Sequence, residues 1–141
     1  MPNELLKIVE YKITKPPIDR YWTLFDSTGW NDVCKFTIEE LNIALENSWH
    51  SVSAYSEGIL IGSGRIISDG IHHALIVDLI IDPNYQGKGI GSEILKRLLE
   101  KCTGNNIRDI QLFSAKEKFK FYEKFGFEKR AENAPGMEYK Y

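Results

Sequence analysis

The stretch HALIVDLIIDPNYQGKGIGSEILKRLLEK, from His73 to Lys101, decides the fold. It opens with an apolar run, Ala74 to Ile81, which is rich in Ile, Val and Leu and which only Asp78 interrupts. Such a run is typical of a strand that is buried on both faces of a sheet. Because proline lacks the N–H that a sheet ladder needs, Pro83 predicts the end of this strand.

The residues that follow predict a glycine-rich loop leading directly into a helix. Glycine occupies every second position at Gly87, Gly89 and Gly91, and apolar residues then recur at helical spacing from Ile90 to Leu99. A strand, a bare loop and a helix N-terminus direct several backbone N–H groups toward one point. Together with the helix dipole they predict an anion site, most naturally for phosphate, to which Lys88 adds a full positive charge.

Two common phosphate-binding patterns do not fit this loop. The P-loop pattern needs a Gly-Lys-Ser or Gly-Lys-Thr triplet, which the chain lacks. The dinucleotide pattern G-x-G-x-x-G needs a different glycine spacing, although Asp109 lies roughly where its ribose-binding acid is expected. A third pattern, Q/R-x-x-G-x-G/A after a strand that ends in x-P, fits at Gln86, Gly89 and Gly91. A glycine-rich turn without a ligand is the remaining alternative.

With this third pattern the chain resembles the GNAT N-acetyltransferase superfamily, whose members bind the pyrophosphate of acetyl-CoA on this loop. The segments RIISDG before the strand and FYEKFGF after the helix extend the resemblance over roughly residues 49–127. It implies an acetyl-CoA-dependent N-acetyltransferase in which the amine attacks directly within a ternary complex. It implies neither a metal nor a covalent enzyme intermediate.

Hydrophobic periodicity and turn residues predict the rest of the chain. We expect strands over 6–14, 49–55, 60–67, 107–113 and 137–141, and helices over 18–27, 37–47 and 116–124. Thr37 and Glu40 form a capping-box pattern at the start of one of these helices. The expected order is β-α-α-β-β-β-α-β-α-β-β in a single N-acetyltransferase domain, 1–141. The fold class is therefore α/β, a mixed sheet with helices on both faces and a right-handed parallel crossover.

Composition excludes several classes of protein. The chain of 141 residues is 43% hydrophobic and 27% charged, as in an ordinary soluble domain. Its formal net charge of −2 argues against a nucleic-acid binder and against a polybasic membrane surface. Apolar runs are far shorter than the ~20 residues of a membrane helix, and no signal-peptide pattern opens the chain. Cys34 and Cys102 are isolated thiols, so we expect a cytoplasmic protein.

The resemblance assigns coenzyme-binding roles to the end of the strand and to the loop. The backbone of the strand's last residues is expected to bind the pantetheine arm, and one of its N–H groups to stabilise the oxyanion. The same residues alternatively only complete the sheet and the core. The expected coenzyme-binding residues are Leu79, Ile80, Ile81, Gln86, Gly87, Lys88, Gly89, Ile90, Gly91 and Ser92.

Two residues are candidates for proton transfer. Tyr122, in FYEKFGF, occupies the position of the family's general acid, because a phenol is protonated at neutral pH and can donate to the leaving thiolate. Asp78 is the candidate base, since a lone carboxylate in an apolar strand is costly unless it is paired or working. The alternatives are an aromatic core residue for Tyr122 and an ion pair with Arg65 for Asp78. The family's coenzyme-binding Asn is replaced by Ala115.

The acceptor and the assembly are less specified. His72 and His73 titrate near neutrality, but two adjacent histidines at a turn are more often surface residues. The aromatic stretch 22–36 is expected to wall the acceptor pocket, with Trp30 as the best substrate contact. We expect a small-molecule amine as acceptor and a possible homodimer. Proteins or peptides as acceptors, a non-catalytic acyl-CoA-binding module and a nucleotide-binding redox domain are the alternatives.

Overall fold

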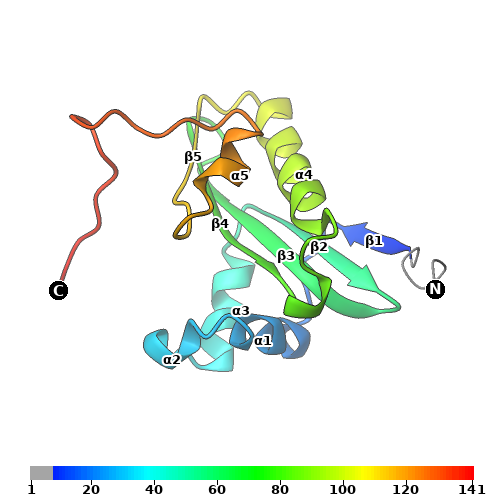
Figure 1. Cartoon of the computed structure of the whole chain (residues 1–141). Helices are drawn as coiled ribbons and strands as arrows, with labels where there is room; N and C mark the ends of the chain where they lie inside the picture. Colours follow the sequence, from blue (N-terminus) through cyan, green and yellow to red (C-terminus); the bar gives the residue numbers. More distant parts are fainter. Residues whose placement is uncertain (1–7) are drawn as a thin grey trace.

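A computed structural model describes residues 8–141 of the chain as one five-stranded mixed sheet with helices on both faces (Figure 1). The sheet follows chain order, β1-β2-β3-β4-β5, with antiparallel pairs up to β4 and a parallel pair between β4 and β5. The strands are β1 Val9–Lys12, β2 His50–Ser56, β3 Ile59–Ser68, β4 His73–Ile81 and β5 Asp109–Leu112. The helices are α1 Ile18–Asp26, α2 Asn31–Cys34, α3 Ile38–Glu46, α4 Ile90–Gly104 and α5 Phe119–Glu123, with a 3₁₀ turn, η2, at Pro83–Tyr85.

Each face of the sheet has its own hydrophobic cluster. Helix α4 covers one face, where Ile94, Leu95 and Leu98 pack fully buried against the central strands. Helices α1 and α3 cover the opposite face, where Tyr21, Leu24 and Leu41 are among the buried residues (Figure 1). The predicted mixed sheet with helices on both faces is therefore confirmed.

Local signals fixed several element boundaries. Helix α3 begins at the predicted capping box, in which Thr37 Oγ1 accepts from Glu40 N–H and Glu40 Oε1 accepts from Thr37 N–H. The strand, loop and helix of the 73–101 stretch form as predicted, with β4 ending at Ile81 and α4 starting at Ile90. The strand predicted over 6–14 forms as β1 at an edge of the sheet, although the first two residues of its predicted range lie outside the described residues.

Two parts of the predicted element order are wrong. A short helix, α2, lies between the predicted helices 18–27 and 37–47, where no helix was expected. The predicted strand from Met137 to Tyr141 does not form, and no strand follows α5 (Figure 1). The alternating pattern is there, but a strand requires a neighbouring strand, and residues 137–141 run away from the body of this chain.

Strand β4 bends at Asp78, which has a left-handed backbone with φ 51°. The pairing of β3 with β4 shifts register at this point, from Arg65 opposite Val77 to Ser63 opposite Ile80. An extra residue of this kind is a β-bulge, which bends and twists its strand. Opposite the bulge, Gly64 lies so close to Leu98 that an added Cβ would come within 2.9 Å of its Cδ1.

The bulge separates the second half of β4 from β5. The two strands pair from His73 opposite Asp109 only as far as Ile76 opposite Leu112. Beyond this point β4 continues to Ile81 with β3 on one side and no described partner strand on the other. The sheet therefore opens between its two parallel strands, at the end of β4 that leads into the glycine-rich loop.

Candidate functional site

A cavity of about 460 Å³ lies where β4 and β5 part. It is lined by the end of β4, the glycine-rich loop, the first turn of α4 and helix α5. Of the residues predicted from the sequence it contains Leu79, Ile81, Gln86, Gly87, Gly89, Ile90, Gly91, Ser92 and Tyr122. The structure thus brings the predicted anion loop and the predicted acid to a single cleft, although about 30 residues separate them in the sequence.

The loop gives its glycines conformations that few other residues adopt. Gly87 has φ 74° and Gly89 has φ 84°, and Gly89 is the N-cap of α4. The first helical hydrogen bond runs from the N–H of Glu93 to the carbonyl of Gly89 over 3.1 Å. The preceding N–H groups lie outside the helical ladder, at the positive end of a helix of 15 residues, where an anion could bind them.

Gln86 links the loop to the strand. Its Nε2 donates to the carbonyl of Ile81 over 3.1 Å, which ties the loop to the end of β4. Two predicted coenzyme residues do not line the cleft. Ile80 is buried in the cluster under α1 and α3, and Lys88 holds its Nζ 5.4 Å from the centre of the Tyr85 ring.

Three lining residues were not predicted from the sequence: Tyr85, Lys118 and Phe121. Lys118 supplies a cation to the cleft, which Lys88 does not line. Phe121 immediately precedes Tyr122, so the FYEKFGF motif itself was the available signal. Ala115, which replaces the family's Asn, also lines the cleft and offers it only a methyl group.

Tyr122 is half-buried among aromatic rings of α5 and the following turn. Its ring lies edge-on to Phe121 at 5.1 Å and to Phe127 at 6.2 Å between centroids. Burial raises the pKa of the Tyr122 hydroxyl above its ordinary value of 10.0. The group is therefore protonated at neutral pH, which is the state that a general acid requires.

Asp78 belongs to a polar cluster on the other face of the sheet. Arg65 donates to its Oδ2 from Nη2 over 2.9 Å and from Nε over 3.1 Å. Arg65 Nη1 also donates to Ser48 Oγ over 3.2 Å. Burial, and next the charge of Asp78, raise the pKa of Tyr21 to about 12, so this phenol is also protonated. Asp78 therefore has the ion pair that the sequence offered as the alternative, on the side that α1 and α3 cover.

Trp30 lies at the start of α2. It does not line the cavity that holds the predicted coenzyme residues, named here the coenzyme cleft. Its ring packs edge-on against Phe25 at 5.7 Å, and 41% of the residue is exposed. Phe36 contacts the same ring at 6.3 Å and is equally exposed. The aromatic stretch thus forms a small partly exposed surface over the helices on the Asp78 side of the sheet, and the role of Trp30 stays a prediction.

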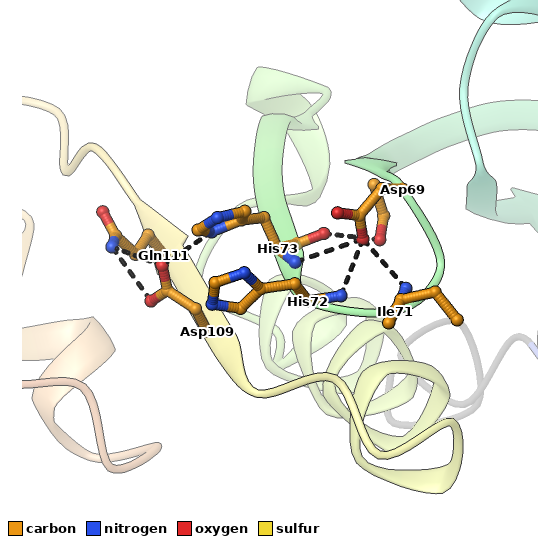
Figure 2. Close-up of polar contacts among 7 residues, drawn as sticks. Asp69, Ile71, His72, His73, Asp109 and Gln111 are labelled. Carbon is orange, nitrogen blue, oxygen red and sulfur yellow. Dashed lines mark hydrogen bonds and ion pairs between the residues drawn. The ribbon is translucent and has the colours of Figure 1, made fainter.

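His73 is the first residue of β4 and His72 precedes it, at the end of the strand far from the glycine-rich loop. Figure 2 shows both side chains. His73 Nδ1 lies 2.8 Å from Asp109 Oδ2, and its ring stacks on His72 at 3.7 Å. Gln111 donates to both oxygens of Asp109, and this contact, followed by His73, lowers the pKa of that carboxyl. Both histidines are exposed, which favours the interpretation as surface residues, and Figure 2 shows His73 linking β4 to Asp109 of β5.

Two searches of residues 8–141 bear on other functions. They contain no group of three or more His, Cys, Asp or Glu side chains arranged to hold a metal ion. They also contain no helix whose length and apolar character would let it cross a membrane.

Comparison with known proteins places the chain in a family. Residues 28–135 match the family model described as an acetyltransferase (GNAT) domain. The histone acetyltransferase TAP1 of Glycine max is 35% identical over 125 residues, which cover 81% of this chain and 53% of that protein. The chain therefore spans about half the length of this curated relative.

Solved structures have the same fold. A probable acetyltransferase, SA2161, from methicillin-resistant Staphylococcus aureus superposes with a TM-score of 0.82 at 28% identity, covering 95% of this chain and all of that one. A predicted acetyltransferase from Clostridium acetobutylicum, solved with acetyl-CoA, has a TM-score of 0.69 at 18% identity and covers 94% of this chain and 96% of that one. Together with the cleft geometry, the family match leads to one conclusion: the chain belongs to the GNAT acetyltransferase family.

Proposed function

We propose that the protein transfers the acetyl group of acetyl-CoA to an amine within a ternary complex. The observation that carries this proposal is the shared cleft, in which the glycine-rich loop at the start of α4 and Tyr122 line one cavity. A phosphate-binding end and a proton donor within the same cavity suit a coenzyme whose pyrophosphate and thioester are far apart. The acetyl-CoA in the C. acetobutylicum structure supports the choice of coenzyme.

The open edge of β4 would hold the pantetheine arm. An amide-rich chain can hydrogen-bond to a strand edge as an additional strand does, and β4 beyond Ile76 has such an edge. Leu79 and Ile81 line the cavity there, and a backbone N–H of Leu79, Ile80 or Ile81 is the proposed donor to the oxyanion. The pyrophosphate would bind the N–H groups of the loop and first helical turn, with Gln86 bracing the loop.

Acyl transfer then needs two proton movements. The amine nitrogen attacks the thioester carbonyl carbon, the carbon–sulfur bond breaks, and the electron pair remains on sulfur. Tyr122 would give its proton to this thiolate, forming coenzyme A, and would regain a proton from solvent. Asp78 would accept the amine's surplus proton through water, with Arg65 holding Oδ2 in place.

We propose a small-molecule amine as the acceptor, because the sequence has a net charge of only −2 and no acidic or basic insert of the kind that selects a charged peptide. A protein acceptor is the second candidate, and the relative named histone acetyltransferase supports it. The partly exposed aromatic surface around Trp30 suits a cation of either source.

The decisive experiment measures coenzyme A release with a thiol reagent during incubation with acetyl-CoA and a library of amines. The library contains small primary and secondary amines in one arm and lysine-bearing histone peptides in the other. Turnover in the first arm alone supports the small-molecule proposal, and turnover in the second alone replaces it. Tight acetyl-CoA binding with no release in either arm would point to the non-catalytic binding module instead.

A further inference from the structure

Two connections that follow different strands line the coenzyme cleft. One is the glycine-rich loop after β4, and the other is the turn between β5 and α5, which contributes Ala115 and Lys118. Because β4 and β5 are parallel, both connections leave the carboxyl ends of their strands, where open sheets bind their ligands. A ligand that fills the cleft therefore contacts both connections.

Lys118 is the only charged residue among the described residues that line this cleft. In the part of the chain that the structure describes, its ammonium group has no hydrogen bond and no ion pair. The ammonium group of Lys88, by contrast, lies against the ring of Tyr85. Since no described carboxylate lines the cleft, Lys118 brings an uncompensated positive charge to it.

The turn that carries Lys118 contains a strained residue. The N–H of Lys118 donates to the Ala115 carbonyl over 3.0 Å, and Ser114 Oγ donates to the same carbonyl over 2.8 Å. Glu117, within this turn, has a left-handed backbone with φ 62°. Residues with a side chain rarely adopt this conformation, and such strain is concentrated at sites that bind ligands. The conformation of the turn therefore favours a binding role for Lys118.

We propose that Lys118 binds the pyrophosphate of the coenzyme from the side of the cleft opposite the glycine-rich loop, so that the two form a phosphate clamp. This inference rests on the proposed use of acetyl-CoA. Each phosphate of the pyrophosphate carries a negative charge, whereas the loop offers uncharged N–H groups and the partial charge of the α4 dipole, about +0.5. The ammonium group of Lys118 offsets much of the remaining charge, and lysine binds phosphate as a point charge.

The clamp also accounts for two other features of the cleft. Lys88, which the sequence offers as the cation of the loop, does not line the cleft. On the side of α5, Ala115 offers only a methyl group in place of the family's coenzyme-binding Asn. Lys118 therefore supplies the polar contact that Ala115 cannot make.

Isothermal titration with acetyl-CoA tests the clamp without requiring turnover. Lys118→Gln should weaken binding by about 10- to 100-fold at low salt, because a hydrogen bond to a charged group is lost. The difference should shrink as salt is added, since salt screens the charges in the wild-type complex. Lys118→Arg keeps the charge and should retain most of the affinity. The matched control is Lys120→Gln, because Lys120 is also exposed but does not line the cleft.

Two shortened coenzymes identify the group that Lys118 binds. 3′-Dephospho-acetyl-CoA keeps the pyrophosphate, so Lys118→Gln should weaken its binding by the same factor as for acetyl-CoA. Acetyl-pantetheine has no phosphate, so the substitution should not change its binding.

The failure of the clamp is distinguishable from the failure of the proposed function. The clamp is overturned, and the coenzyme retained, if Lys118→Gln binds acetyl-CoA as the wild-type chain does. The same holds if its effect disappears with the dephospho compound, or persists with acetyl-pantetheine. A wild-type chain that binds no acetyl-CoA would overturn the proposed function itself, and the clamp with it.

Discussion

At the scale of single residues, the proposed chemistry rests on one phenol, Tyr122, and one carboxylate, Asp78. Tyr122 and Tyr21 are both protonated phenols, but only Tyr122 lines the coenzyme cleft. Tyr21 is instead a buried residue of α1, and the charges of Asp78 and Arg65 act on it. The proposed acid, Tyr122, and the proposed base, Asp78, therefore lie on opposite sides of the bulged strand β4.

Tyr122→Phe removes one oxygen and keeps the ring. We expect kcat to fall by about 10²–10⁴-fold with little change in the KM for acetyl-CoA, because the acid acts only in the transition state. Burial raises the pKa of the Tyr122 hydroxyl above its ordinary value of 10.0, so the hydroxyl loses its proton only in strongly alkaline solution. The rate of the wild-type protein should decline there, and the variant should lack this decline. Steady-state rates measured across the pH range give both the fall in kcat and the loss of the alkaline decline. A variant with near wild-type kcat would remove Tyr122 from the mechanism.

Asp78 combines a charge with a left-handed backbone, and two variants separate these properties. Asp78→Asn keeps a residue that tolerates positive φ but loses the charge, so we expect a lower kcat. The free energy of unfolding should fall by about 1–3 kcal/mol, because Arg65 loses its ionic partner. Asp78→Ala should cost about 1–2 kcal/mol more in unfolding free energy, because alanine is strained at this φ. Urea denaturation and steady-state rates make the comparison. Equal stability of the two variants would contradict the backbone argument.

At the scale of elements, the glycine-rich loop acts through its backbone. Gly89→Ala strains a residue at φ 84° and places a methyl group at the expected phosphate position, so acetyl-CoA affinity should fall far more than in Lys88→Ala. Gly29→Ala is the matched control: it has φ 77°, open surroundings as at Gly89, and a position outside the cleft. Both glycine variants should lose about 1–2 kcal/mol of stability, but only Gly89→Ala should lose affinity. Isothermal titration in which Lys88→Ala binds worst would reverse this interpretation.

The turn between β3 and β4 provides a pH-dependent element (Figure 2). Asp69 Oδ1 accepts from the N–H groups of Ile71, His72 and His73 over 2.8–3.2 Å, and these bonds lower its pKa below 3.8. A depressed folded-state pKa contributes stability above the unfolded value, and that stability is lost as the pH falls through the folded value. Asp69→Ala should therefore lower the urea midpoint at pH 7 and have less effect near pH 3. Asp69→Asn, which retains an acceptor oxygen, should lose less, and an equal loss at both pH values would contradict the charge argument.

The elements also show what sequence patterns can and cannot predict. The strand, loop and helix from His73 to Lys101 were predictable, because burial, proline, glycine and helical spacing are all local signals. The bulge was not predictable, because no sequence pattern indicates that Asp78 adopts a left-handed backbone inside an apolar run. The four-residue α2, closed by Lys35 at φ 55°, is too short for periodicity. The electrostatic interaction between Tyr21 and Asp78 joins residues 57 positions apart, which only the folded chain brings together.

On the scale of the whole molecule, the sheet separates the surface proposed to bind the coenzyme from the surface proposed to bind the acceptor. The coenzyme cleft is lined by residues of β4, α4 and α5, whereas Asp78 pairs with Arg65, which also contacts Ser48 after α3, and Trp30 begins α2. Figure 1 shows α1, α2 and α3 on the opposite side of the sheet from α4. The gap between β4 and β5 is the place where a thioester bound in the cleft would meet an amine from the other face. Substrate choice should therefore depend on the helices after β1, while coenzyme affinity depends on the loop before α4.

Trp30→Ala tests this division. If Trp30 contacts the acceptor, the KM for the amine should rise by about tenfold, corresponding to about 1.4 kcal/mol of lost contact, with the KM for acetyl-CoA unchanged. Phe36→Ala is the matched control, because Phe36 has the same 41% exposure and packs against the same Phe25 ring. Similar effects of both variants on both substrates would instead mean that the aromatic cluster only supports the helices. A selective effect of Trp30→Ala would place the acceptor over α2, on the Asp78 side of the sheet.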